Sequence, residues 1–195
     1  LMHTNVAASA VFAATSGSSI ATAATISTIS IPNMERYGYK APMFLGTIAA
    51  GGTLGILIPP SINMVLYGAM SETSVSDLYL AATIPGLMLA LIFSLYVYIS
   101  CKINPSLGPE REPAPWGERF SALVHLLPPL MLFLLVVGSI YAGLATATEA
   151  SALGVVGSLV LVIARGRLSL EMLLRSFEGT VRTTAMVMAI VIAAF

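Results

Sequence analysis

An apolar stretch from about residue 42 to 70 is interrupted by the run Gly51-Gly52-Thr53-Leu54-Gly55-Ile56-Leu57-Ile58-Pro59-Pro60-Ser61. Glycine destabilises a helix interior, and proline lacks an amide donor and clashes with the preceding turn. The run therefore predicts two half-helices of roughly ten residues joined by an extended segment. A simple proline kink is the alternative. Because broken helices in transporters bind ions and anionic groups at their ends, this run is a candidate site.

The composition around this run is typical of a membrane protein. Of the 195 residues, 57% are hydrophobic and only 9% are charged, and the mean hydropathy is +0.91. Soluble domains carry about 25% charged residues, so this chain has too few to cover a surface in water. The net charge of zero leaves no basic footprint for nucleic acid. The predicted fold class is an all-α polytopic membrane protein.

Further apolar stretches predict more membrane spans. They cover about residues 78–101, 123–145 and 148–164, and another begins near Thr183. Crossing the hydrocarbon takes about 20 residues, so the 148–164 stretch is short for a span. Alternate crossing puts the loops 32–42, 102–120 and 165–182 on one side, and the breaks 71–77 and 145–149 on the other.

The distribution of basic residues tests this topology independently. The first group of loops contains all nine: Arg36, Lys40, Lys102, Arg111, Arg119, Arg165, Arg167, Arg175 and Arg182. Cytoplasmic loops carry the excess of lysine and arginine, so we expect this side to be cytoplasmic. Within the third loop, an apolar stripe and two i,i+4 ion pairs over 169–182 predict a helix on the membrane surface, separate from the span near Thr183.

The first apolar stretch, residues 5–31, is too rich in hydroxyls for a lipid-facing helix. Its centre, Ser16-Gly17-Ser18-Ser19, is typical of a turn. Divided there, arms at about 3–14 and 19–31 would each be roughly 18–20 Å long as helices, which suits a re-entrant hairpin. A single small-residue helix packed among neighbours fits the spacing equally well.

The acidic residue Glu149 begins another predicted helix. Thr146 or Thr148 would cap that helix, with Glu149 in its first turn, although an acid inside a membrane can also serve transport. The sequence contains no nucleophile–base pair, no phosphate-binding loop and no cluster of metal-binding side chains. An enzyme is therefore not predicted.

Several motifs together resemble a known family. They are His3-Thr4-Asn5-Val6, Ser16-Gly17-Ser18-Ser19, Ile31-Pro32-Asn33-Met34, Gly55-Ile56-Leu57-Ile58-Pro59-Pro60-Ser61, Met64-Val65-Leu66-Tyr67-Gly68, Ile84-Pro85-Gly86 and Thr146-Ala147-Thr148-Glu149-Ala150. In these the chain is similar to the large membrane subunit of tripartite ATP-independent periplasmic (TRAP) transporters of the C4-dicarboxylate type. The similarity covers nearly the whole chain, which corresponds to about the middle of a subunit roughly twice as long. The chain begins at Leu1 and stops within an apolar run, so we expect it to be an internal fragment.

The resemblance implies an inverted-repeat ion-transporter fold with a re-entrant hairpin and a broken helix in each repeat. It favours the hairpin over the single helix for residues 5–31. Residues 1–101 would hold the hairpin, broken helix and following span of the first repeat, 102–120 a cytoplasmic linker, and 121–195 the start of the second repeat. The whole protein would take up organic acids with Na⁺ as the coupling ion, together with a periplasmic substrate-binding protein and a small membrane subunit, in the bacterial inner membrane.

The resemblance also implies a site where the hairpin tip meets the broken helix. The expected Na⁺ ligands are the hydroxyls of Ser16, Ser18 and Thr53 and the carbonyls of Gly17, Gly52, Gly55 and Ile58. The expected substrate contacts are Ser19, Thr22, Ser61 and Asn63, which open helical arms. Two positions depart from the family pattern: Thr22 stands where many relatives have Asp, and Ala147 stands where the family has Pro.

Two other functions fit the residues less specifically. One is an ion-coupled carboxylate transporter that needs no binding protein, and the other is a channel or a membrane scaffold that transports nothing. The fragment would contain half of the site, because the second hairpin would follow Phe195.

Overall fold

The computed structural model describes residues 1–108 and 116–194, without the side chains of 116, 118–122 and 194. Every regular element in this part of the chain is a helix. In chain order they are α1 (Met2–Ser16), α2 (Ser19–Arg36), α3 (Ala41–Leu57), α4 (Ile62–Ser71), α5 (Val75–Ile103), the short 3₁₀ helix η1 (Pro105–Leu107), α6 (Trp116–Tyr141), α7 (Ala147–Ala164) and α8 (Leu170–Ala194). The chain forms two compact units, Leu1–Gly154 and Val155–Phe195, and their boundary lies within α7.

Five helical stretches of the described chain are long and apolar enough to cross a membrane. They are Ala41–Ser71, Val75–Ile103, Leu123–Tyr141, Ala147–Ala164 and Leu170–Ala193. The prediction of an all-α polytopic membrane protein is confirmed. The division into two repeats joined by a linker at 102–120 stays a prediction, and residues 109–115 of that linker lie outside the described part.

The first apolar stretch is two helices joined by a turn. Gly17 lies between α1 and α2 with a φ of 61°, a left-handed conformation that glycine adopts at little cost. The Gly17 amide donates to the carbonyl of Ala13, which closes α1, and α2 begins after Ser18. The single-helix alternative is wrong. Both arms are longer than predicted, and α2 continues through Pro32 to Arg36.

The predicted unwinding of the glycine segment is also wrong. Helix α3 runs without interruption through Gly51, Gly52 and Gly55 to Leu57, and the backbone leaves the helix only at residues 58–61. A glycine costs a helix about 1 kcal/mol and an interior proline about 3 kcal/mol, so the break falls at the prolines and not at the glycines. Proline alone does not decide it, because Pro32, Pro85 and the pair Pro128-Pro129 lie inside α2, α5 and α6.

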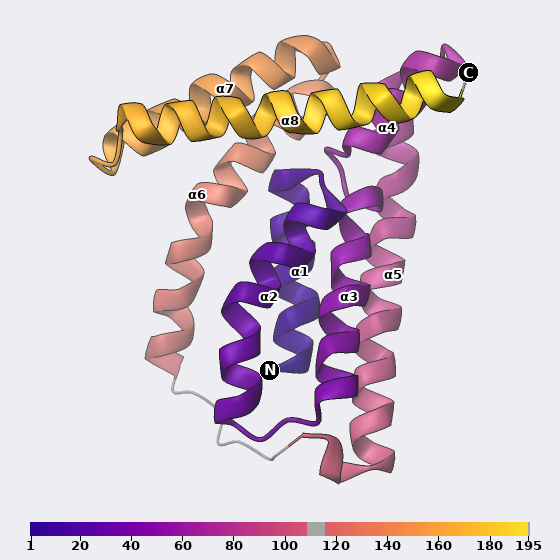
Figure 1. Cartoon of the computed structure of the whole chain (residues 1–195), viewed down its shortest axis with the longest axis vertical. Coiled ribbons are helices and arrows are strands. Elements are labelled where there is room, and N and C mark those ends of the chain that lie inside the picture. Colours follow the sequence, from indigo (N-terminus) through magenta and orange to yellow (C-terminus); the bar gives the residue numbers. More distant parts are fainter. Residues whose placement is uncertain (109–115, 195) are drawn as a thin grey trace. The chain divides into compact units, whose positions relative to one another are not determined.

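The three glycines act in packing instead of unwinding. They belong to α3, which packs against α1 and α2 (Figure 1). A Cβ atom on any of the three would overlap the hairpin: Gly51 against the side chain of Ser9, Gly52 against Ala23, and Gly55 against the Ser18–Ser19 backbone. Lipid supplies no hydrophobic force between helices, so close backbone approach at small residues is the usual way for membrane helices to associate.

A buried polar network joins the same three helices further from the turn. The side chain of Asn5 in α1 accepts a hydrogen bond from Ser30 in α2 at 2.8 Å and donates one to Thr47 in α3 at 3.1 Å. Asn5 and Thr47 are each 4% exposed. Hydrogen bonds of this kind between membrane helices are worth about 0.6–2 kcal/mol each, so the network adds to the packing that fixes the hairpin on α3.

Contacts at the two ends of the first unit agree with the predicted grouping of its own loops, and the place of 165–182 stays a prediction. At one end, the Lys40 amide donates to the carbonyl of Leu107 and the Lys40 ammonium donates to the hydroxyl of Ser106 at 2.7 Å, so 32–42 and the start of 102–120 lie together. At the other end, Tyr79 packs against Ile140 and Ala150, near the breaks at 71–77 and 145–149.

The helix cap predicted before Glu149 is present, and Thr146 is the residue that forms it. The Thr146 amide and hydroxyl each donate to the Glu149 carboxylate at 2.8 Å, and the Glu149 amide donates back to the Thr146 hydroxyl at 3.3 Å. This reciprocal capping box satisfies amides that the first turn of α7 leaves without a partner. Glu149 therefore has a structural role at this helix end.

In the second unit, the predicted surface helix and the span after it are one helix. Helix α8 runs from Leu170 to Ala194, with ion pairs Glu171–Arg175 at 2.7 Å and Glu178–Arg182 at 3.8 Å. The predicted boundary near Thr183 is wrong because residues 170–194 contain no proline, and one glycine, Gly179, is too weak a breaker to end a helix.

The packing role of the glycines predicts that two glycines of α3 differ in their tolerance to alanine. In Gly52→Ala the new methyl group would lie 2.8 Å from the Ala23 Cβ, and overpacking should destabilise the protein by about 1–3 kcal/mol. In Gly46→Ala nothing lies within 4 Å of the added Cβ, so the higher helix propensity of alanine should leave stability unchanged or raise it. The melting temperatures of the purified full-length proteins check this, and equal effects would contradict it.

Candidate functional site

The hairpin tip joins the end of one helix to the start of another. Ser18 is the N-cap of α2, and its hydroxyl accepts from the Ala21 amide at 3.3 Å. The Thr22 hydroxyl donates to the Ser18 carbonyl at 2.7 Å, which uses its one proton, so the Ser16 hydroxyl is the donor in the 3.1 Å bond to Thr22. These bonds hold the turn of the hairpin in one conformation.

The break in the second stretch joins helix ends in the same way. The amide of residue i in a helix bonds to the carbonyl of residue i−4, and proline has no amide proton. Pro59 and Pro60 therefore leave the carbonyls of Gly55 and Ile56 without helical donors. Ser61, the N-cap of α4, is 1% exposed, and its hydroxyl has no hydrogen-bond partner within the described chain.

The tip and the break meet directly. The Ile62 amide donates to the Gly17 carbonyl at 3.2 Å. A Cβ atom on Gly17 would collide with the carbonyl oxygen of Pro60, and one on Gly55 would lie 2.7 Å from the Ser18 carbonyl carbon. The absence of side chains at Gly17 and Gly55 thus lets the backbone of the tip touch the backbone of the break.

The structure separates the predicted site residues into two groups. Those at the meeting of tip and break are Ser16, Gly17, Ser18, Gly55, Ile58 and Ser61. The others lie differently: Gly52 is inside α3, Thr53 is exposed and donates to the Ala50 carbonyl at 2.7 Å, Asn63 is exposed on α4, Ser19 is half-buried at the start of α2, and Thr22 is fully buried inside the hairpin.

Sequence reasoning missed one residue at this place. The Tyr79 hydroxyl, from α5, donates to the Ser61 carbonyl at 3.5 Å, and the side chain is 3% exposed. The chain has seven tyrosines, and no motif or spacing distinguishes Tyr79 from the other six. Only the packing of α5 on the broken helix brings it there.

The site is electrically neutral apart from its helix ends. Residues 16–22 and 55–63 contain no acidic or basic side chain, and the described residues hold no cluster of three or more His, Cys, Asp and Glu that could hold a metal ion. Helices α1 and α3 end here, and α2 and α4 begin here. Helix C-termini carry partial negative charge and N-termini partial positive charge, so both a cation and an anion find complementary groups.

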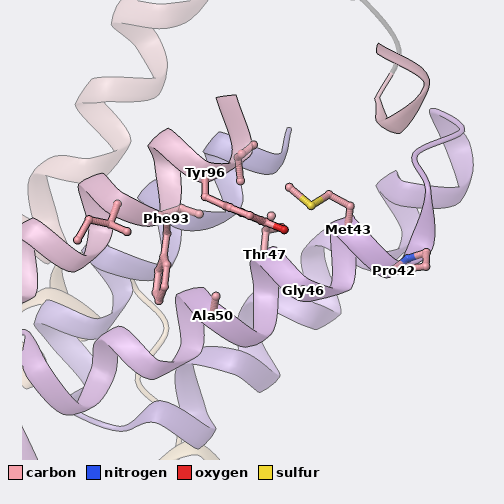
Figure 2. A pocket seen from close by; sticks show the side chains of 10 residues that line it. Pro42, Met43, Gly46, Thr47, Ala50, Phe93 and Tyr96 are labelled. Carbon is pink, nitrogen blue, oxygen red and sulfur yellow. The ribbon is translucent and has the colours of Figure 1, made fainter. Parts of the chain in front are cut away.

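A separate groove lies between α3 and α5. It has a volume of about 430 Å³ and includes none of the tip or break residues. Figure 2 shows Phe93 and Tyr96 of α5 together with Met43 and Thr47 of α3 around it. Its walls are largely apolar, and it offers no convergent polar groups comparable to those at the tip and break.

Comparison with known proteins agrees with this architecture. A family model described as the DctM component of the tripartite ATP-independent periplasmic transporter matches residues 1–195. The chain is 42% identical over 147 residues to the large permease protein DctM of a C4-dicarboxylate TRAP transporter from Pseudomonas aeruginosa, which covers 75% of this chain and 34% of that protein.

Relatives with other named substrates are similar over more of the chain. The large permease protein UehC of an ectoine/5-hydroxyectoine TRAP transporter from Ruegeria pomeroyi is 36% identical over 95% of this chain and 42% of its own. The sialic acid TRAP transporter protein SiaM from Vibrio cholerae is 32% identical over 96% of this chain and 44% of its own. The chain thus spans less than half the length of these relatives. With a family model that matches every residue, this chain belongs to the family of the DctM component, the large membrane subunit of TRAP transporters.

Proposed function

We propose that the full-length protein is the membrane subunit that moves organic acids across the bacterial inner membrane with Na⁺ as the coupling ion. The observation that carries this proposal is the buried contact between Gly17 and the Pro60–Ile62 backbone, where four helix ends meet. A transporter that couples a cation to an anion needs groups of both polarities in one place. Two helix C-termini and two helix N-termini supply them.

The oxygens at the meeting of tip and break fit a Na⁺ ion. Hard cations prefer oxygen ligands, and neutral carbonyl and hydroxyl groups suffice for a single charge. The ligands we propose are the Gly17 carbonyl, which keeps one lone pair, the proline-freed Gly55 carbonyl, the buried Ser61 hydroxyl, and oxygens of Ser16, Ser18 and Ile58.

Two residues expected as Na⁺ ligands are left out of this proposal. The Gly52 carbonyl is inside α3, where it accepts a helical hydrogen bond, and the Thr53 hydroxyl is exposed and bonded within its own helix.

The buried Ser61 hydroxyl, which has no partner within the described chain and lies at the break, supports an ion at this place. Burying such a group costs about 1–3 kcal/mol, and native proteins seldom leave one unsatisfied without a reason. A cation bound by the Ser61 hydroxyl would remove that cost. We therefore reassign Ser61 from the predicted substrate contacts to the proposed Na⁺ ligands.

The proposed substrate is an organic acid, a dicarboxylate or a related carboxylate. A carboxylate would be bound by backbone amides at two helix starts. One is the start of α2, beside Ser19, and the other is the start of α4, near Asn63. The relatives are named for C4-dicarboxylates, for ectoine and 5-hydroxyectoine, and for sialic acid, so the family is not limited to one substrate.

We further propose two partners, a periplasmic substrate-binding protein and the small membrane subunit of the same transporter. In this arrangement the loops 32–42 and 102–120 and the segment 165–182, which includes the first half of α8, face the cytoplasm with all nine basic residues.

The coupling ion is tested with the full-length subunit, purified with the small membrane subunit and reconstituted into vesicles. An inward Na⁺ gradient should drive uptake of radiolabelled succinate in the presence of the binding protein, because the ion and the anion share one site. Replacing Na⁺ by K⁺ or choline should abolish uptake. Uptake indifferent to Na⁺ would contradict the coupling, and full uptake without the binding protein would favour a transporter that needs none.

The ligand role of Ser61 is tested against a second buried serine. Ser9 in α1 is 0% exposed and its hydroxyl also lacks a partner, but it faces Gly51 away from the tip. Ser61→Ala should raise the Na⁺ concentration for half-maximal uptake about tenfold or more, because the variant lacks the hydroxyl that would bind the charged ion. Ser9→Ala should leave that concentration unchanged.

In Na⁺-free buffer, both variants should have a melting temperature at least as high as that of the wild type, since each removes a buried hydroxyl without a partner in the described chain. If the two variants have the same Na⁺ dependence, Ser61 is not a ligand.

A further inference from the structure

The peptide unit between Ser61 and Ile62 links two parts of the first unit. Its N–H group, from Ile62, donates to the Gly17 carbonyl of the hairpin tip at 3.2 Å. Its carbonyl group, from Ser61, accepts from the Val65 amide at 3.2 Å and from the Tyr79 hydroxyl at 3.5 Å. A peptide unit is planar, so a bond that fixes its carbonyl also fixes the direction of its N–H.

We infer that Tyr79 is a positioning residue for the cation site, acting through this peptide plane on the Gly17 carbonyl. The inference rests on the proposed function, because it concerns the same site. The hydroxyl of Tyr79 holds the Ser61 carbonyl, the plane aims the Ile62 amide at the tip, and the tip carbonyl keeps the orientation in which it can receive a cation. Tyr79 itself touches neither ion nor substrate.

The surroundings of Tyr79 explain how one hydroxyl can hold a backbone segment. The ring is 3% exposed and packs with Ile140 and Ala150, and Met64 and Val75 lie against the same cluster. The ring therefore has little freedom to move, and its packing fixes the position of the hydroxyl. Hydrogen bonds in a chain polarise one another at low dielectric, so the bond to Ser61 also strengthens the Ile62 amide as a donor.

A second tyrosine in the same region provides a matched control. The Thr83 hydroxyl donates to the Tyr79 carbonyl at 2.8 Å, which uses its one proton, so the Tyr141 hydroxyl is the donor in the 2.7 Å contact with Thr83. Tyr141→Phe thus removes a phenolic hydroxyl and one hydrogen bond near Tyr79, and it leaves the Ser61–Ile62 peptide untouched.

The experiment compares Tyr79→Phe and Tyr141→Phe in the full-length subunit, with its partner proteins, in vesicles. Tyr79→Phe keeps the packed ring and removes only the hydroxyl. We expect it to raise the Na⁺ concentration for half-maximal uptake about twofold to fivefold, because the lost hydrogen bond is long at 3.5 Å and the Val65 amide still binds the same carbonyl. The substrate KM at saturating Na⁺ should stay within twofold of the wild type. Tyr141→Phe should match the wild type in both quantities.

A purely structural role gives a different pattern. A lower melting temperature and lower uptake at every Na⁺ concentration, with an unchanged half-maximal concentration, would overturn the inference. So would an equal shift in both variants. If wild-type uptake itself is independent of Na⁺, the proposed function and the inference fall together. If wild-type uptake depends on Na⁺ and Tyr79→Phe does not change that dependence, the inference alone fails.

Discussion

The hydrogen bond from the Ile62 amide to the Gly17 carbonyl depends on two interruptions in helical backbone. A continuous α1–α2 would have no turn to offer a carbonyl, and a continuous α3–α4 would use the Ile62 amide within the helix. Glycine in the left-handed conformation makes the first interruption, and two prolines without amide protons make the second. The structure places these interruptions against each other, and every oxygen of the candidate site belongs to one of them or to a residue beside them.

Keeping the turn at Gly17 against the break at Pro59-Pro60 requires a rigid connection between the hairpin and α3. Hydrophobic burial supplies little of it in a membrane, because lipid is as apolar as the side chains. The connection comes instead from glycines, which let the backbones of α2 and α3 approach, and from the Asn5–Thr47–Ser30 hydrogen bonds. Glycine in this chain thus has two separate roles. Gly17 makes a turn, whereas Gly52 makes room for a neighbouring helix.

A site made of helix ends can bind charged ligands without charged side chains. Its partial charges lie in backbone groups whose orientation is fixed by folding, so no arginine or aspartate has to be buried in the membrane at high cost. Such a site would bind without the strength of a full ion pair, which suits the proposed transport, in which both ion and substrate must be released. Its binding strength then depends on the orientation of a few peptide planes, and residues such as Tyr79 that fix those planes become important.

The sequence by itself determined the membrane class and located the break at Pro59-Pro60. It also located the turn at Ser16–Ser19, without deciding between a hairpin and a single helix. These follow from composition and from residues whose backbone chemistry acts locally. It did not determine whether Gly51, Gly52 and Gly55 unwind α3 or pack it, because a glycine's effect depends on which neighbour approaches it. Only the tertiary structure decided that α1 lies on Gly51 and α2 on Gly52 and Gly55, that Thr22 is enclosed in the hairpin, and that Tyr79 reaches Ser61 from 18 residues away. Those contacts arise from helix packing, which no local pattern encodes.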